Sequence, residues 1–303
     1  MRKLWRHVSR LTVATMLCAA AGVAQTPPAL KAFHPEGPLA AFDVATIKPA
    51  DPEKQFAGTT IRRYIAGAYD VSNGNVMLPG QQTYSRVIGG PEWVDKDRYD
   101  IKGKPPDEVR EAMQKMPNEQ RAVQNRMMQQ SLLAERFHLK VHFEMRETTI
   151  FELVPAKGGL KIAPVDPPAP PSEMAQALPP KPGDPPPAGG VRISITSGGV
   201  TSIEARAVTA EMLGNMVRNL APEIGGKPVV DMTGFQGKFD VKDFRFLGTI
   251  PPQVGGGSTN NIEPPDAPSL THELEEKLGM KLVSVKGQAE VVVIDSIDRP
   301  TEN

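Results

Sequence analysis

Three side chains between residues 138 and 144 carry groups that bind transition metals. His138 and His142 are four residues apart, and Glu144 follows two residues later. In a single strand all three would point to one face, because strand side chains alternate with a period of two. Two imidazoles and a carboxylate would then supply the three protein ligands that a zinc site needs.

An internal repeat argues against this metal site. The stretch LAERFHLKV (133–141) matches LEEKLGMKL (274–282) without a gap, and Tyr99–Lys102 matches Phe239–Lys242 in the same order. In this alignment His138 corresponds to Gly279, a residue type that commonly ends helices. We therefore expect His138 to leave the strand, and we predict no bound metal and no cofactor.

No other combination of residues predicts catalysis. The sequence lacks the G-x-S-x-G motif of a strained nucleophile turn, and no Gly-rich phosphate loop precedes a helix. Asp100 and Asp240 are equivalent in the repeat, and each follows an aromatic residue. Such repeated aspartates are more typical of carboxylates that accept local backbone hydrogen bonds, so we assign no catalytic residue.

The N-terminus has the features of an export signal. Four basic residues precede the apolar run Leu11–Ala21, and Gly22-Val23-Ala24 offers a cleavage site. Cleavage would remove Cys18, the single cysteine, and reduce 35 basic residues to 31 against 35 acidic ones. This negative balance disfavours nucleic-acid binding. No later run approaches the about 20 apolar residues of a membrane span, so we expect a periplasmic or secreted protein.

Proline and glycine divide the rest of the chain. We predict a signal peptide (1–24), a flexible leader (25–40), a first lobe (41–162), a linker (163–190) and a second lobe (191–303). The linker holds eleven prolines, which prevent sheet pairing. The second lobe contains a Gly/Pro loop at 248–268.

Within each lobe the hydrophobic periodicity predicts helices followed by β-hairpins. Helices are expected at about 60–69, 107–116, 118–137, 209–220 and 269–278, with Thr209 and Ser269 as N-caps. Hairpins are expected at 93–102, 139–154, 192–204, 229–244 and 280–297. The predicted fold class is α+β, with two similar lobes of helix-plus-hairpin units whose helices pack on antiparallel sheet.

Longer segments of the sequence are those of a known family. They are FDVATIKP (42–49), GGPEWVDKDRYDIKGK (89–104), LLAERFHLKVHFEMRE (132–147), FELVPAKGG (151–159), PVVDMTGFQGKFD (228–240) and the tail AEVVVIDSIDRPTEN. In these segments the chain resembles a large paralogous family of uncharacterised secreted proteins best known from Acidobacteria, the Solibacter-type domain of unknown function. The resemblance implies no catalytic residue. Some relatives carry a similar domain on membrane metallopeptidases of the antibiotic-sensor type, which implies extracellular sensing.

These observations favour a non-catalytic binding module of the cell envelope, whose partner is an envelope or extracellular protein or ligand. Trp93, Tyr84 and Phe235 are the candidate interaction residues, although Trp93 and Phe235 align across the repeat and are also consistent with core packing. Two alternatives stay open: an envelope hydrolase with a dispersed active site, and the extracellular sensory arm of a membrane sensor peptidase.

Overall fold

The computed structural model describes residues 28–51, 53, 57–71, 86–166, 185–187, 189–196, 199–221, 223–248 and 267–300. The predicted signal peptide, Tyr84, and most of the proline-rich linker and of the Gly/Pro loop lie outside these residues.

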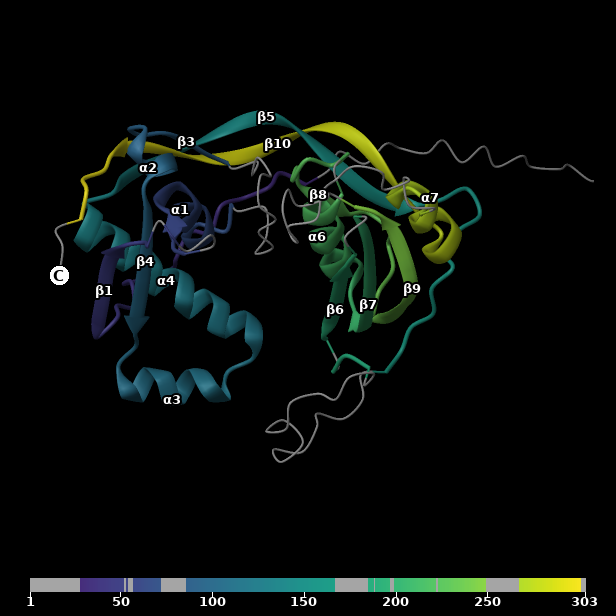
Figure 1. Cartoon of the computed structure of the whole chain (residues 1–303), viewed down its shortest axis with the longest axis horizontal. Coiled ribbons are helices and arrows are strands. Elements are labelled where there is room, and N and C mark those ends of the chain that lie inside the picture. The colour runs from purple at the N-terminus through teal and green to yellow at the C-terminus, as the bar shows by residue number, and fades with distance from the viewer. Residues whose placement is uncertain are drawn as a thin grey trace, which may run out of the picture.

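The described chain is a mixed α+β structure (Figure 1). Its strands are β1 (Val44–Pro49), β2 (Thr59–Thr60), β3 (Val87–Gly89), β4 (Arg98–Lys104), β5 (Lys140–Pro155), β6 (Val191–Ile195), β7 (Val200–Val208), β8 (Val229–Asp231), β9 (Phe239–Leu247) and β10 (Met280–Ser296). Its helices are α1 (Ile61–Ala68), α2 (Trp93–Lys96), α3 (Asp107–Lys115), α4 (Asn118–Phe137), α6 (Ala210–Leu220) and α7 (Leu270–Glu273), which continues into the π-helical turn η1 (Leu274–Leu278).

A long two-stranded ribbon spans the molecule. Strands β5 and β10 pair antiparallel from Val141 opposite Ile294 to Pro155 opposite Met280. Figure 1 shows this teal and yellow ribbon running from the α1 and α4 end to the α6 and α7 end. Short strands complete its sheet in the order β3-β10-β5-β8, and β3 and β8 both pair parallel to the ribbon.

Two further sheets lie below the ribbon in Figure 1. Their strand orders are β1-β4-β2 and β6-β7-β9, and all their pairings are antiparallel. The β6–β7 hairpin has the predicted pairing, with Arg192 opposite Glu204.

The other four predicted hairpins are wrong. Residues 139–154 and 280–297 form no hairpins, because β5 and β10 continue through the expected turns and pair with each other. The Lys286-Gly287 step is no turn: Gly287 lies against Ile150, whose Cδ1 would be 2.6 Å from an added Cβ. A glycine inside a strand often marks such a close approach instead of a turn.

The hairpins at 93–102 and 229–244 fail for a related reason. Residues 93–96 form the short helix α2, and β4 pairs with β1. Strand β8 pairs with β5, while β9 pairs with β7. In each case the strand pairs with a partner distant in sequence and not with the neighbouring segment.

Two separate hydrophobic cores lie at the two ends of the ribbon. The first gathers buried residues of the N-terminal elements with the last residues of β10: Ile47, Ile61, Ile65, Val94, Tyr99, Leu133, Phe137, Val292 and Ile294. The second gathers residues of the C-terminal elements with the end of β5: Leu153, Ile203, Leu213, Val217, Phe239, Phe244, Leu274 and Leu278.

The caps of two helices are as predicted. Thr209 Oγ1 accepts the Met212 N–H at 3.2 Å, and Ser269 Oγ accepts the His272 N–H at 3.2 Å. Each bond satisfies one of the free N–H groups that begin a helix.

Part of the segment expected to be a flexible leader is paired instead. The Leu30 N–H donates to Gln288 O at 2.9 Å, and the Glu290 N–H donates to Leu30 O at 2.8 Å. Ala32 is buried in the first core. Residues 30–32 therefore lie beside β10, one of the two ribbon strands.

Candidate functional site

The structure brings together two of the three candidate metal ligands. His142 lies on β5, where its Nδ1 is 2.7 Å from Asp295 Oδ1 and its Nε2 is 3.2 Å from Glu144 Oε1. His138 lies apart from them, and its Nδ1 is 3.1 Å from Asp298 Oδ2. Among the described residues no group of three or more His, Cys, Asp or Glu side chains is arranged to hold a metal ion.

This surface cluster instead favours a charged imidazole. Hydrogen bonds to Glu144 and then to Asp295 raise the pKa of His142 above its ordinary value. The pKa of Glu144 is lowered, first by its hydrogen bond from Arg146 and then by His142. The arrangement is a set of exposed ion pairs, and a single exposed ion pair contributes little stability.

His138 is the residue that ends α4. Its φ is 47°, in the left-handed region, and its Nδ1 is 3.1 Å from Asp298 Oδ2. Gly279 follows η1 in the same conformation, with a φ of 64°. His138 therefore leaves the strand, as its alignment with Gly279 predicts.

The two described aromatic candidates are half-buried against their own cores. Trp93 packs on the first core, and the guanidinium carbon of Arg299 lies 5.5 Å from the centre of its ring. Phe235 packs on the second core and meets Phe239 edge to face, with ring centres 5.7 Å apart. One face of Trp93 is thus covered by the C-terminal segment, and Phe235 contributes to packing. Tyr84 lies outside the described residues.

Asp240 has the structural role expected for the repeated aspartates. Its carboxylate accepts the Ala207 N–H at 3.0 Å, where β7 bulges and Ala207 has a φ of 52°. This bond stabilises a backbone conformation that a residue with a Cβ rarely adopts. Asp100 lies exposed on β4.

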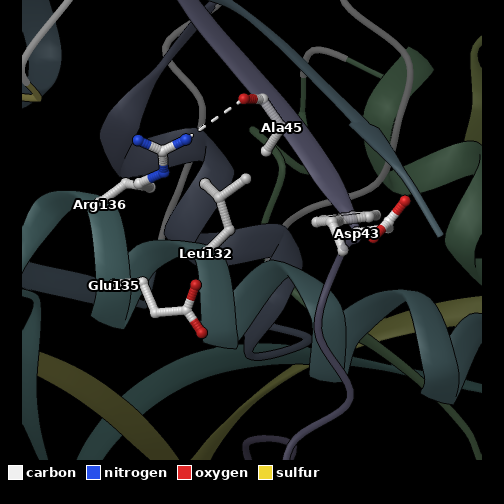
Figure 2. Close-up of a pocket in the computed structure, with 6 residues that line it drawn as sticks. Asp43, Ala45, Leu132, Glu135 and Arg136 are labelled. Atoms are coloured by element: carbon white, nitrogen blue, oxygen red, sulfur yellow. Dashed lines mark hydrogen bonds between the residues drawn. The ribbon is translucent and has the colours of Figure 1, made fainter. Parts of the chain in front are cut away.

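An open pocket of about 110 Å³ lies between the first strand and the long helix. Phe42, Asp43 and Ala45 line it from the β1 side, and Leu132, Glu135 and Arg136 line it from α4. Figure 2 shows Arg136 reaching from the helix to the strand, where its Nη2 lies 3.4 Å from the Ala45 carbonyl oxygen. The pocket therefore places two carboxylates and a guanidinium beside the backbone of β1.

Local packing shapes one wall of this pocket. A Cβ at Gly103, on the neighbouring strand β4, would lie 2.6 Å from the Phe42 ring. The absence of a side chain at Gly103 therefore allows the Phe42 ring to lie over β4. Glu135 also accepts the Ser131 hydroxyl at 2.9 Å, which holds its carboxylate along the helix.

The pocket residues carry no sequence pattern that marks them as a site. Glu135 and Arg136 belong to the repeated block, where Glu276 and Lys277 are their counterparts, and this placed them in the scaffold. Asp43 and Ala45 lie about 90 residues earlier in the chain. Their proximity depends on how β1 packs against α4, and a single sequence does not give this packing.

Two basic side chains, Arg86 and Arg218, lie close enough to interact electrostatically. Arg86 is 7% exposed and donates to the backbone oxygens of Leu30 and Glu290 at 3.1 and 2.9 Å. Burial lowers the pKa of Arg218, on α6, to about 10, and Asp70 partly opposes this. Arg86 therefore holds together the backbone of the segment at Leu30 and of β10.

None of the described helices has the length and apolar character needed to cross a membrane. Comparison with curated proteins and with solved structures finds no match. The family described as "Protein of unknown function (DUF3738)" matches residues 62–297, which span α1 to β10 and include both cores. The chain therefore belongs to the DUF3738 family.

Proposed function

We propose that this protein is an exported, non-catalytic interaction module of the cell envelope, built from two copies of one α+β unit and of the acidobacterial type that its sequence resembles. The observation that carries the binding function is the pocket at β1. Its volume of about 110 Å³ is well below the roughly 300–1,000 Å³ of sites that enclose a small molecule. An open notch with charged walls beside a strand suits contact with another polypeptide.

Strand order supports the duplication. Apart from the elements that stand between them, the order in the first unit is β1, α1, β3, β4, α4 and β5. The order in the second unit is β7, α6, β8, β9, η1 and β10. The short strand after the first helix pairs parallel with the ribbon strand of the other unit, as β3 does with β10 and β8 with β5. Phe151 and Val292, the first paired residues in these ladders, are 141 positions apart, the same offset as Leu133 and Leu274.

The segments that leave the ribbon support it further. After β10, the Asp298 N–H donates to Phe137 O, the last residue of α4, at 2.8 Å. After β5, the Lys161 N–H donates to Leu278 O, the last residue of η1, at 2.9 Å. Phe137 and Leu278 are equivalent in the repeat, so both exits from the ribbon make the same contact.

Export is tested by the fate of the N-terminus. The full chain, expressed in a Gram-negative host, is expected in the periplasmic fraction with Gln25 as its first residue, measured by intact mass. Ala24→Arg is expected to block cleavage, since peptidases require a small residue there. Recovery of wild type from the cytoplasm with residues 1–24 attached would contradict export.

Binding is separated from hydrolysis by two measurements on the mature chain (25–303). Immobilised protein is expected to retain a saturable partner from envelope extracts, while a panel of peptide, ester and glycoside substrates is expected to show no turnover. Turnover that His142→Ala abolishes and His138→Ala retains would overturn the non-catalytic assignment in favour of a hydrolase.

A further inference from the structure

The two proposed units differ at one sheet edge. Strands β1 and β7 occupy equivalent places in the two units. Each precedes the first helix of its unit, and each has an antiparallel partner, since β1 pairs with β4 and β7 pairs with β9. The second edge of β7 is covered by β6. The second edge of β1 has no strand beside it in the part of the chain that the structure describes.

The backbone of β1 is oriented to accept another strand. The Ala50 N–H, directly after β1, donates to Arg98 O of β4 at 2.8 Å. Because successive residues of a strand direct their backbone groups to opposite sides, Thr46 and Lys48 face β4. The N–H and C=O groups of Ala45 and Ile47 therefore point away from β4, toward the vacant edge.

The surroundings of this edge favour an occupant. Val44, on β1, is 55% exposed and offers an apolar side chain to a partner. The pocket of Phe42, Asp43 and Ala45 opens along the same edge. The Ala45 carbonyl accepts a 3.4 Å hydrogen bond from Arg136, and a carbonyl oxygen has lone pairs for two donors. Pro49 ends the open stretch, because it has no N–H to offer.

From this difference we propose that the outer edge of β1 binds an extended segment of another protein, which adds to the sheet as an antiparallel strand. The inference rests on the proposed duplication and deepens the proposed binding function. Strand β6 shows what such a segment resembles: β-branched residues at alternate positions (Val191, Ile193 and Ile195) with a basic residue between them. Backbone hydrogen bonds supply the affinity, and the alternate side chains supply the specificity.

The charged side chains near β1 indicate where the basic residue of the added strand lies. In the second unit Arg192 of β6 forms an ion pair with Glu204 of β7 at 2.7 Å. At the β1 edge the carboxylates of Asp43 and Glu135 line the pocket together with the guanidinium of Arg136, so the acidic groups outnumber the basic one. A lysine or arginine of the added strand meets these carboxylates as Arg192 meets Glu204.

The test uses a fluorescent peptide with the β6 sequence, residues 190–196 (GVRISIT), and the mature chain. Anisotropy is expected to show saturable binding, and hydrogen exchange is expected to slow at the outward N–H groups of Ala45 and Ile47. Ala45→Pro removes one outward N–H while keeping the ladder to β4, and should raise the Kd at least about tenfold. Ala45→Ser keeps that N–H and should bind like wild type.

A charge swap keeps the proposal testable if Ala45→Pro fails to fold. Asp43→Lys should weaken the peptide several-fold, and the same peptide carrying Arg192→Glu should recover the loss. No binding, or equal binding by wild type and Ala45→Pro, would overturn the proposal. Self-association of wild type that Ala45→Pro abolishes would also overturn it, because the occupant would then be a second copy. An envelope partner still retained by Ala45→Pro would exclude the β1 edge while leaving the interaction function intact.

Discussion

The ends of α4 and η1 use the same backbone conformation in different surroundings. Both close with a left-handed residue, His138 with a φ of 47° and Gly279 with a φ of 64°. At Gly279 an added Cβ would overlap the Gly159 carbonyl oxygen, and Lys161 N would lie 2.7 Å from it. At His138 the side chain extends into solvent and pairs with Asp298. The segment after β5 therefore packs more closely on its helix end than the segment after β10 does.

The largest expected effect lies in the residues just before these two ends. Phe137 is fully buried in the first core, and Leu278 is 5% exposed in the second. Phe137→Ala should lower the free energy of unfolding by about 4 kcal/mol and Leu278→Ala by about 3 kcal/mol, from lost burial and the cavities left. Urea unfolding monitored by circular dichroism measures both. A loss below about 1 kcal/mol for either would show that its helix end is not part of a core.

The helix-end comparison itself is tested at Gly279. Gly279→Ala should cost about 2–3 kcal/mol, because the left-handed conformation penalises a Cβ and the overlap with Gly159 forces the neighbouring segment to move. Thermal unfolding checks this. If Gly279→Ala is tolerated, the segment after β5 does not hold the close position described here.

The N-caps of helices α1 and α6 offer a smaller contrast. Thr209 caps α6 through its side chain, whereas Thr60 occupies the N-cap of α1 without a side-chain hydrogen bond. Thr209→Ala should cost about 1 kcal/mol, and Thr60→Ala, its matched control, only a few tenths. Equal losses in chemical denaturation would mean that the cap is not what distinguishes these helices.

A gain is expected where the left-handed residue carries a side chain. His138→Gly should raise the free energy of unfolding by up to about 1 kcal/mol, because glycine adopts positive φ without the steric cost. Its exposed pair with Asp298 contributes little that would be lost. A clear destabilisation measured by urea titration would show that the His138–Asp298 pair holds the helix end.

The smallest effect is the pH dependence of the His142 cluster. The pKa of His142 is raised above its ordinary value of 6.5, so its stabilisation is fully present below that value and is lost as the pH rises through the folded-state pKa. NMR titration of the imidazole should give a value above 6.5, and Asp295→Asn should lower it. Titration at or below 6.5 in wild type would contradict the carboxylate contacts.

Local features of this fold were predictable from sequence, and long-range pairings were not. The helices at 61–68 and 210–220 and the caps Thr209 and Ser269 follow from periodicity and side-chain chemistry within a few residues. The ribbon joins β5 and β10, which lie about 140 residues apart, and an apolar strand alone does not specify its partner. In sequence, the Lys286-Gly287 step is typical of a turn, although in the structure Gly287 accommodates Ile150 within the strand.

The site shows the same division. The exit of His138 from the strand was predicted from its alignment with Gly279. The carboxylates that flank His142 were not predicted as a pair, because Asp295 comes from the other ribbon strand, 153 positions away. The pocket likewise combines Asp43 with Glu135, whose proximity depends on how β1 docks on α4.

The pairing of β3 with the distant strand β10 imposes an order on the folding of the chain. Strand β3 obtains its partner from residues 292–294 of β10, so the four-stranded sheet stays incomplete at β3 until these residues have been synthesised. Until then Ile294 and Ile297 cannot contribute to the first core, and long-range contacts of this kind are slow to form. Removal of residues 292–300 would therefore damage the first core, which also contains residues of helix α1.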